Sequence, residues 1–449
     1  MRQTNIFDFL IESFTTNINN IEDTRKQRTN IIYSLKDIII SAFSVFYFQN
    51  KSWLSFQRDT NTKKGISNAQ TMFGISDIPS DNHIRNILDK ITPDSFKKVY
   101  EIIIDKLQEI GILDKFNFKD EYMLVALDGT YYHSSKNISC KCCQTRKDKD
   151  SGEIHYYHSV ITPTIVHPDL KKVIPLMQEF ISNNDGDDKQ DCEINASKRW
   201  LDSFTNPTSK KLVILGDDLY SREPMIKKVL DKNHSYIFVA KPTSHKYLYE
   251  QIDMIKNLKT IDTKIISKIL NGKKQTFTYN YINKLSIKNP QGDTQHPPQE
   301  VNWCEIIVTN ATGKKLYHNS FITDISLNIN NVVDIATAGR ARWKIENENN
   351  NTLKTKGYHL DHNFGHGAEN LSKTLCSLNI LAFLFHTVQE LDDDLYIELR
   401  ENIGTREEFF IGINFLTTMF NFKSFNKMLE YILIARQTEQ NVDMKGYVV

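Results

Sequence analysis

The run Tyr122-Met123-Leu124-Val125-Ala126-Leu127-Asp128 decides the fold class of this chain. Its six residues before the aspartate carry no charge and are mostly apolar, which is typical of a strand buried on both faces of a sheet. Two more runs of this kind stand at residues 211–216 and 236–240, with a helical pattern between them. Strand, helix and strand at this spacing form a βαβ unit with parallel pairing. The sequence therefore predicts an α/β protein.

The segments around these strands divide the chain into regions of different pattern. Residues 160–166 and 172–177 are predicted as two further strands, paired through a short turn. Residues 81–91 and 93–110 have a helical pattern, and they form either a helix-turn-helix that contacts DNA or an ordinary pair of packed helices. We predict five regions: a helical N-terminal domain at 1–120, the first part of the α/β core at 121–260, a β-rich insertion at 261–325, the second part of the core at 326–395, and C-terminal helices at 396–449.

Composition bounds the class of protein. Of 449 residues, 40% are hydrophobic and 25% are charged, as in ordinary soluble globular proteins. A formal net charge of +1 means that any nucleic-acid surface must be a local patch. The six cysteines are too few for a disulfide scaffold and indicate a reducing compartment. Residues 1–12 lack the apolar segment of a signal peptide, and the apolar run at 374–385 is about half as long as a membrane span. We therefore expect a cytoplasmic protein that does not cross a membrane, with a buried core helix at 374–385.

Carboxylates follow two of the buried strands directly. Asp128 ends the first strand and is followed by Gly129, and Asp217 and Asp218 end the second. The ends of central strands lie at the rim of a sheet, where α/β proteins place their chemistry. A turn aspartate is the alternative for each position.

A third acidic residue stands in an unusual helical run, Arg340-Ala341-Arg342-Trp343-Lys344-Ile345-Glu346-Asn347-Glu348-Asn349-Asn350-Asn351-Thr352-Leu353-Lys354. Four asparagines in one helix are unexpected, because asparagine prefers caps and turns. Arg342, Glu346, Asn350 and Lys354 recur every four residues and share one helical face, which suits a metal and a phosphate backbone. The alternative is a solvated face with an Arg–Glu pair. The apolar members of the run are expected to pack against the core: Trp343, Ile345 and Leu353.

Soft ligands cluster after the first strand. Cys140 and Cys143 have the C-x2-C spacing, and His155 and His158 follow. Four such ligands could hold a structural Zn²⁺. The two histidines are three residues apart, so on one strand they would point to opposite faces, which leaves a reduced hairpin loop with partly buried thiols as the alternative. The loop at 359–367 carries three more histidines, and it is either catalytic, in contact with DNA, or held by its own hydrogen bonds.

Asp128, Asp217 and Glu346 together offer hard oxygen ligands of the kind that bind Mg²⁺ or Mn²⁺. Two such ions stabilise the attacking and leaving oxygens of a phosphoryl displacement. The sequence has no phosphate-binding P-loop, which argues against a nucleoside-triphosphate engine. Basic residues near these carboxylates could contact phosphates: Lys241, Arg222, Arg340, Arg342, Lys344, Lys354 and Lys356.

With these motifs the chain resembles the bacterial insertion-sequence transposases of the DDE type, and within them the branch with a β-strand insertion before the glutamate. Six features carry the resemblance: Leu127-Asp128-Gly129-Thr130; Gly216-Asp217-Asp218-Leu219-Tyr220-Ser221; Arg342-Trp343-Lys344-Ile345-Glu346 with Leu353-Lys354; the loop at 362–367; the segment from Ile78-Pro79-Ser80-Asp81 through Arg85; and Gln190-Asp191-Cys192-Glu193 with Lys198-Arg199-Trp200. It covers roughly residues 35 to 390. The resemblance implies a ribonuclease H-like mixed sheet flanked by helices, with a helical N-terminal domain and a β-rich insertion.

The resemblance also implies site residues. Asp128, Asp217 and Glu346 would be the catalytic and metal-binding triad, with Asp218 and Glu348 as adjacent alternatives. The family often has a tyrosine seven residues before the glutamate, where this chain has a glycine, Gly339. The residues expected to bind DNA are Arg342, Lys344, Asn350, Lys354 and Lys241.

The function that the resemblance implies is metal-dependent phosphodiester hydrolysis and strand transfer at the ends of an insertion sequence. The partners would be double-stranded DNA, as terminal inverted repeats and target, and a second copy of the chain in a homodimer. The expected location is the bacterial cytoplasm, on the nucleoid during transposition. Two alternatives stay open: a metal-dependent nuclease on the same fold, and an inactive DNA-binding protein descended from a transposase.

Overall fold

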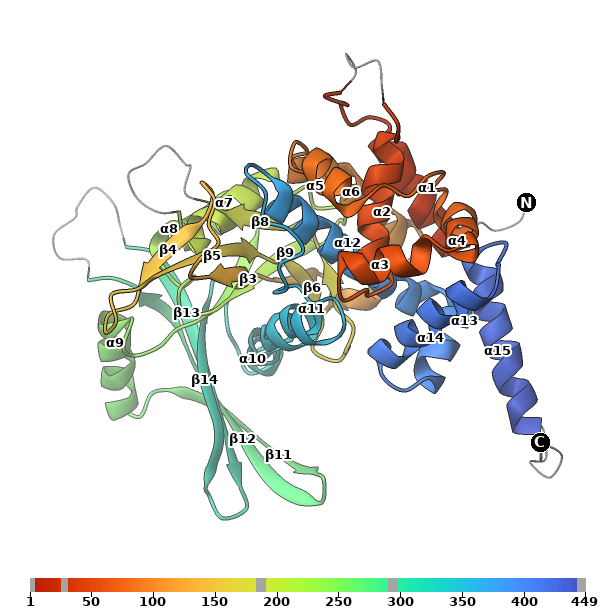
Figure 1. Ribbon diagram of the computed structural model, residues 1–449. Helices are drawn as coiled ribbons and strands as arrows, with labels where there is room; N and C mark the ends of the chain where they lie inside the picture. The colour runs from red at the N-terminus through yellow and green to blue at the C-terminus, as the bar shows by residue number, and fades with distance from the viewer. Residues whose placement is uncertain (1–4, 26–30, 183–190, 290–297, 442–449) are drawn as a thin grey trace.

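The computed structural model describes residues 5–25, 31–182, 191–289 and 298–441 (Figure 1), so Gln190 of the quoted motif lies outside the described residues. The protein is of mixed α/β type, as the sequence predicts. Its central sheet has the strand order β11-β12-β13-β14-β10-β9-β2-β6-β7, and β1 (Asn117–Phe118) pairs with β2 beside this path. The strands of the order are β2 (Tyr122–Ala126), β6 (Thr164–Val166), β7 (Ile174–Pro175), β9 (Lys211–Gly216), β10 (Ser235–Val239), β11 (Asp262–Leu270), β12 (Lys273–Ser286), β13 (Glu300–Asn310) and β14 (Lys315–Thr323).

The centre of the sheet is parallel. β2 pairs with β9 and β9 with β10 in parallel register, which confirms the predicted βαβ unit. Its crossover helix is α8 (Glu223–Asp231), and α7 (Glu193–Ser203) precedes β9. β6 pairs antiparallel with both β2 and β7, which confirms the pairing predicted between 160–166 and 172–177, although residues 160–161 belong to β5 and not to β6. The side chains of β2, β9 and β10 are almost all buried, which explains their lack of polar alternation.

A second sheet begins where the chain leaves the first. β3 (Gly129–Ser135) begins right after Asp128, and its partner β5 (Ile154–Ile161) ends just before β6. β5 also pairs with β4 (Gln144–Lys147) and β8 (Glu179–Ile181). The chain therefore changes sheet at Asp128, and the backbone carbonyl of Asp128 accepts a hydrogen bond from the Thr162 N–H at 3.1 Å across this break.

The β-rich block predicted at 261–325 extends the central sheet. β14 pairs antiparallel with β10, and β13, β12 and β11 follow outward. β11 and β12 project from the protein as a two-stranded arm (Figure 1). Helix α9 (Lys246–Asn257) connects this block to β10.

Helices from both ends of the chain form one bundle beside the sheet (Figure 1). The Tyr47 hydroxyl of α2 (Leu35–Tyr47) donates to Gln389 Oε1 of α12 (Leu371–Asp392) at 2.7 Å, and both side chains are buried. The regions 1–120 and 396–449 thus share one hydrophobic core, although the sequence suggested separate units. The other helices of this bundle are α1 (Ile6–Ile18), α3 (Trp53–Thr60), α4 (Lys63–Phe73), α5 (Asp81–Leu88), α6 (Lys97–Glu109), α13 (Asp394–Asn402), α14 (Arg406–Met419) and α15 (Phe425–Asn441), with the short turns η1 (Pro93–Phe96) and η2 (Leu113–Phe116).

Helix α3 lies before Gly65, and three helices, α13, α14 and α15, follow residue 393. Helix α12 confirms the predicted core helix. By length and composition it is the one helix in the described part of the chain that could cross a membrane, and 89% of its apolar window is buried inside the protein.

The segment with the third carboxylate is not one regular helix. α10 (Val332–Ala341) leads into the π-helical turn η3 (Ile345–Asn350), which continues as α11 (Asn351–Thr355). Ile345 and Leu353 are fully buried as expected, but Trp343 is 43% exposed. The expected packing of Trp343 is therefore wrong. Short π turns inside helices are rare and are frequently found at functional sites.

Candidate active site and metal cluster

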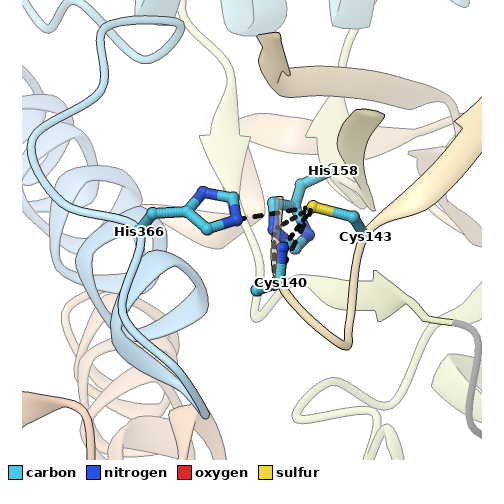
Figure 2. Close-up of side chains that lie close together, drawn as sticks. All are labelled: Cys140, Cys143, His158 and His366. Carbon is cyan, nitrogen blue, oxygen red and sulfur yellow. Dashed lines mark hydrogen bonds between the residues drawn. The ribbon is translucent and has the colours of Figure 1, made fainter. Parts of the chain in front are cut away.

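Two thiols and two imidazoles meet in a compact cluster (Figure 2). The Sγ atoms of Cys140 and Cys143 are 3.8 Å apart, and His158 Nε2 lies 3.4 Å from the first and 3.5 Å from the second. His366 Nε2 lies 3.4 Å from Cys143 Sγ. All four ligand atoms lie within 4.8 Å of one another, which no other group of three or more His, Cys, Asp or Glu residues achieves among the described residues. The cluster could bind a metal such as zinc.

This ligand set corrects one sequence expectation. His155 was expected beside His158, but it lies on β5 opposite Arg146 of β4, near the acidic side chains at 148 and 153. The odd spacing on a strand sends the two imidazoles to opposite faces, as the parity of a strand requires. His366, from the histidine-rich loop before α12, takes the fourth position instead. Sequence spacing could not reveal it, because more than two hundred residues separate His366 from Cys143.

The second candidate site surrounds Asp128, where the chain changes sheet. Burial raises the pKa of Asp128 to about 7, helped by the nearby charges of Glu193, Asp217 and Glu346 and opposed by Arg342. Three acidic residues from distant parts of the sequence therefore act on one half-buried carboxyl group. Such mutual repulsion among carboxylates is typical of sites that hold a cation or a shared proton.

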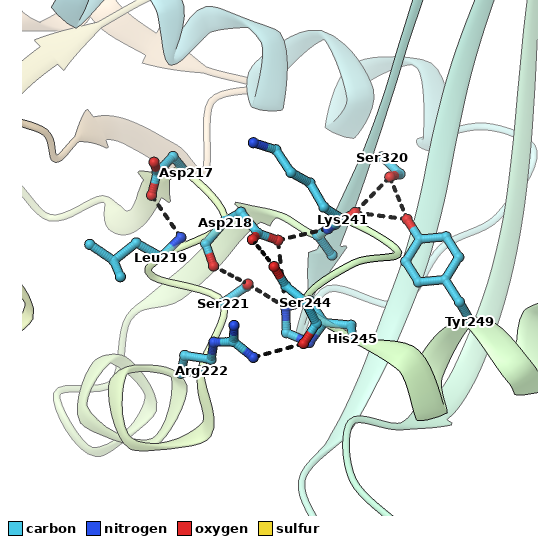
Figure 3. Close-up of polar contacts among 11 residues, drawn as sticks. Asp217, Asp218, Leu219, Ser221, Arg222, Lys241, Ser244, His245, Tyr249 and Ser320 are labelled. Atoms are coloured by element: carbon cyan, nitrogen blue, oxygen red, sulfur yellow. Dashed lines mark hydrogen bonds and ion pairs between the residues drawn. The ribbon is translucent and has the colours of Figure 1, made fainter. Parts of the chain in front are cut away.

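The structure distinguishes the two aspartates after β9 (Figure 3). Asp218 accepts hydrogen bonds from the Lys241 N–H at 2.7 Å and from the Ser244 hydroxyl, so its carboxylate ties the end of β9 to the end of β10. Asp217 points away from this network and accepts from the Leu219 N–H at 2.8 Å. Asp217, which acts on both Asp128 and Glu193, is thus the member of the acidic site.

Glu346 lies at the same site, on the π turn η3. The buried amide of Asn350 holds this turn in place. Asn350 Oδ1 accepts a hydrogen bond from the Thr162 hydroxyl at 2.7 Å, and Thr162 also donates to the Asp128 carbonyl. Asn350 is 6% exposed. The expected contact of Asn350 with DNA is therefore not supported: its amide fixes the position of the helix. Glu348 lies instead near Lys344, on whose ammonium group it acts.

Glu193 is a site residue to which the sequence assigned no role. Its carboxylate accepts hydrogen bonds from the Tyr220 hydroxyl at 2.8 Å and from the Gly129 N–H at 3.2 Å. Burial raises its pKa, and Asp217 acts in the same direction. A side chain at Gly129 would meet the Glu193 carboxylate, since a Cβ atom there would lie 2.7 Å from Oε2. The glycine after Asp128 was the available signal, because it makes room for this acid.

The expected DNA-binding residues fall into two groups. Lys344 is 6% exposed, and its Nζ donates to the Leu170 carbonyl at 2.5 Å, so its expected contact with DNA is not supported. Lys241 is exposed, and it joins the network of Figure 3 through its backbone: its N–H donates to Asp218, and its carbonyl accepts from the N–H groups of Ser244 and His245. Arg342 and Lys354 lie at the acidic site itself; burial lowers the pKa of Lys354, while Asp361 and Asp128 raise it.

Gly339, which stands where the resembling family has a tyrosine, lies against the sheet. A Cβ atom at this position would approach the Phe321 ring to 2.7 Å and Ile237 Cγ2 to 3.0 Å. Helix α10 therefore packs on β10 and β14 with no space for a side chain. The departure from the family pattern has a steric reason in this protein.

No protein-family model matches the chain, and a search of curated proteins finds no match.

Proposed function

We propose that the protein is a DNA transposase that hydrolyses phosphodiester bonds at the ends of an insertion sequence and joins the freed 3′ ends to target DNA. The observation that carries the proposal is the convergence of the charges of Asp217 and Glu346 on the half-buried carboxyl group of Asp128. The first two end parallel strands, and the third lies on a π turn held against them. We assign the mixed sheet to the ribonuclease H-like class on the same grounds.

The residues of this site fit a divalent cation. All donors are carboxylate oxygens, which Mg²⁺ and Mn²⁺ prefer. Burial, and after it the charges of the neighbouring carboxylates, raise the pKa of Asp128, and a bound cation would offset both effects. Asp128, Asp217 and Glu346 would hold it. Such a metal, when bound, activates water and stabilises the charge on the phosphoryl oxygens. Glu193, fixed by Tyr220 and Gly129, keeps a further negative charge beside this donor set.

Cationic side chains at the same site would orient the DNA. Arg342 and Lys354 lie close to Asp128, and Lys241 is exposed at the end of β10. Contacts of this type position a phosphate backbone without reading its sequence. The partners that we assign are terminal inverted repeats and target DNA, bound by a homodimer in the bacterial cytoplasm.

The test compares two glutamates on one turn. Glu346→Gln and Asp128→Asn should abolish Mg²⁺-dependent cleavage of DNA that carries the element's terminal repeats. Glu348→Gln, two residues further along, is the matched control and should retain cleavage. DNA binding, measured by a mobility shift, should persist in all three variants, because metal-ligand carboxylates do not contribute the phosphate contacts that dominate affinity.

The outcomes separate the alternatives. Products joined to a target plasmid identify a transposase, whereas cleavage without joining identifies a nuclease. Binding without any metal-dependent cleavage by the wild-type protein would identify an inactive DNA-binding protein. Full cleavage and joining by Glu346→Gln would overturn the assignment of the site.

A further inference from the structure

We propose that Cys140, Cys143, His158 and His366 bind one Zn²⁺ in a tetrahedral site, and that this ion clamps together the two chain segments that carry Asp128 and Glu346. Zn–S and Zn–N bonds of about 2.3 and 2.05 Å require tetrahedral edges of about 3.8 Å between two sulfurs and about 3.6 Å between sulfur and nitrogen. The protein has 3.8 Å for the sulfur pair and 3.4, 3.5 and 3.4 Å for three sulfur–nitrogen pairs. Four of the six edges of a zinc tetrahedron are thus already near their required lengths, and all four ligand atoms lie within 4.8 Å of one another.

The ligand chemistry selects zinc. Two thiolates and two imidazoles in tetrahedral arrangement form the Cys2His2 set of structural zinc sites, and carboxylate-preferring cations such as Mg²⁺ are unsuited to it. The sulfur atoms are 3.8 Å apart, far beyond a disulfide bond of about 2.05 Å. Neither Cys140 nor Cys143 forms a disulfide bond in the structure. His158 and Cys143 are buried, and the other two ligands are partly so, which is the setting of a closed structural site.

Three segments supply the ligands (Figure 2). Cys140 and Cys143 stand in the turn between β3 and β4, and His158 lies on β5. His366 comes from the loop between α11 and α12. β3 is the direct continuation of Asp128, and the loop follows the helical segment of Glu346. One ion at this point would therefore connect the two halves of the acidic site.

The loop that carries His366 is already positioned by other contacts. The Trp53 indole N–H donates to the Phe364 carbonyl at 2.6 Å. On the other side of His366, the Asp89 carboxylate accepts from the N–H groups at residues 368–371, all within 3.0 Å, and caps α12. Because the loop is fixed at both ends, His366 meets the other three ligands with little loss of conformational freedom, which favours tight binding.

The first test measures metal in the purified full-length protein. Expressed with zinc in the medium and purified without chelators, it should contain about one zinc per chain, as a closed four-ligand site holds. X-ray absorption at the zinc edge should give two sulfur neighbours at about 2.3 Å and two nitrogen neighbours at about 2.0–2.1 Å. Zinc far below one equivalent, or a shell of oxygen neighbours alone, would overturn the proposal.

The matched pair of variants is His366→Asn and His155→Asn. The first should lower the affinity for zinc by about 100-fold or more, since even outer-shell changes weaken metal sites 10–100-fold. The second removes a histidine from the same hairpin that the geometry leaves outside the cluster, and it should bind zinc as the wild-type protein does. Equal loss of zinc in both variants would refute the ligand assignment.

A thiol-protection experiment covers the case in which a variant fails to fold. In the zinc-loaded wild-type protein, Cys140 and Cys143 should resist alkylation, whereas the exposed Cys192 should react at once. Removal of zinc with a chelator should expose both thiols and lower the melting temperature. Alkylation that is indifferent to the chelator, or a Cys140–Cys143 disulfide found by mass spectrometry, would refute the clamp. None of these readouts uses DNA, so the proposal stands or falls separately from the transposase function.

Discussion

Replacement of Gly339 by alanine tests the close packing of α10 on the sheet. In a free helix this change is favourable, because glycine loses more conformational freedom than alanine. At Gly339, however, the new methyl group would lie 2.7 Å from two ring carbons of Phe321 and 3.0 Å from Ile237. Phe321 and Ile237 are at most 1% exposed and cannot move into solvent. The helix must therefore shift away from the sheet.

Helix propensity and overpacking change stability by comparable amounts. Substitution of a second glycine, Gly412, separates the two effects. Helix propensity favours alanine by about 0.5–1 kcal/mol, whereas overpacking of a dense core costs about 1–3 kcal/mol. We expect a net loss of about 0–2.5 kcal/mol for Gly339→Ala. Gly412 lies in the interior of helix α14, on its exposed face, and a Cβ atom there would have no neighbour within 4 Å. Gly412→Ala should therefore raise the free energy of unfolding by about 0.5–1 kcal/mol.

Urea denaturation of both variants measures the difference, which should be about 1–3 kcal/mol and represents the steric contribution alone. Gly339→Ala combined with Phe321→Leu should recover part of this loss, because the smaller side chain makes room for the methyl group. Equal stabilisation by both alanines would refute the close approach of α10. DNA cleavage should fall in Gly339→Ala and not in Gly412→Ala, since the segment after α10 carries Glu346.

Three further predictions concern Lys241, Glu193 and Glu390. Lys241→Ala should weaken DNA binding and reduce the slope of log affinity against log salt by about 1, while Lys344→Met should leave this slope unchanged, as titrations at several salt concentrations can measure. Glu193→Gln keeps an acceptor for its hydrogen bonds but removes a charge beside the metal ligands, so half-maximal cleavage should require more Mg²⁺; an unchanged Mg²⁺ dependence would contradict this. Burial would raise the pKa of Glu390, but Arg406, 2.6 Å away, and other cations lower it. A depressed folded-state pKa stabilises the protein above the unfolded pKa of about 4.3, and the stabilisation is lost as pH falls through the folded pKa. Glu390→Gln should therefore lose about 3–5 kcal/mol of stability at pH 7, with a smaller difference from wild type in strong acid, as urea denaturation across pH would show.

Local pattern was enough to predict the parts of the fold that depend on burial alone. The strands at β2, β9 and β10 have continuous apolar runs because helices or other strands cover both faces, and their order along the chain indicates parallel pairing. The helix at α12 was equally evident from its apolar length. Where strand pairing depends on partners far away in the chain, the sequence pattern did not predict it. Nothing in 261–325 indicates that β14 pairs with β10, so the block was expected as a separate insertion although it extends the central sheet.

The candidate sites show the same difference between features that local sequence predicts and features that depend on distant contacts. Asp128 and Asp217 were predictable because each ends a buried strand, and such ends meet at one edge of a parallel sheet. Glu193 and His366 were not, since each enters its site from a helix start or a loop whose position is set by tertiary packing. The asparagines in the segment that carries Glu346 led to an incorrect expectation of exposure for a related reason. A polar residue on a helix predicts exposure to solvent, yet Asn350 is buried and satisfied by Thr162.

The acidic site and the Cys/His cluster join the same two segments at two points. On one segment, Thr162 and His158 lie four residues apart along nearly extended chain, about 13 Å at strand geometry. The other segment meets them with Asn350 and His366. A single contact would fix a distance but allow the segments to turn about it, whereas two contacts this far apart also fix their relative direction. The placement of Glu346 against Asp128 therefore depends on the cluster as well as on the local amide. A metal there would act on the acidic site without touching it.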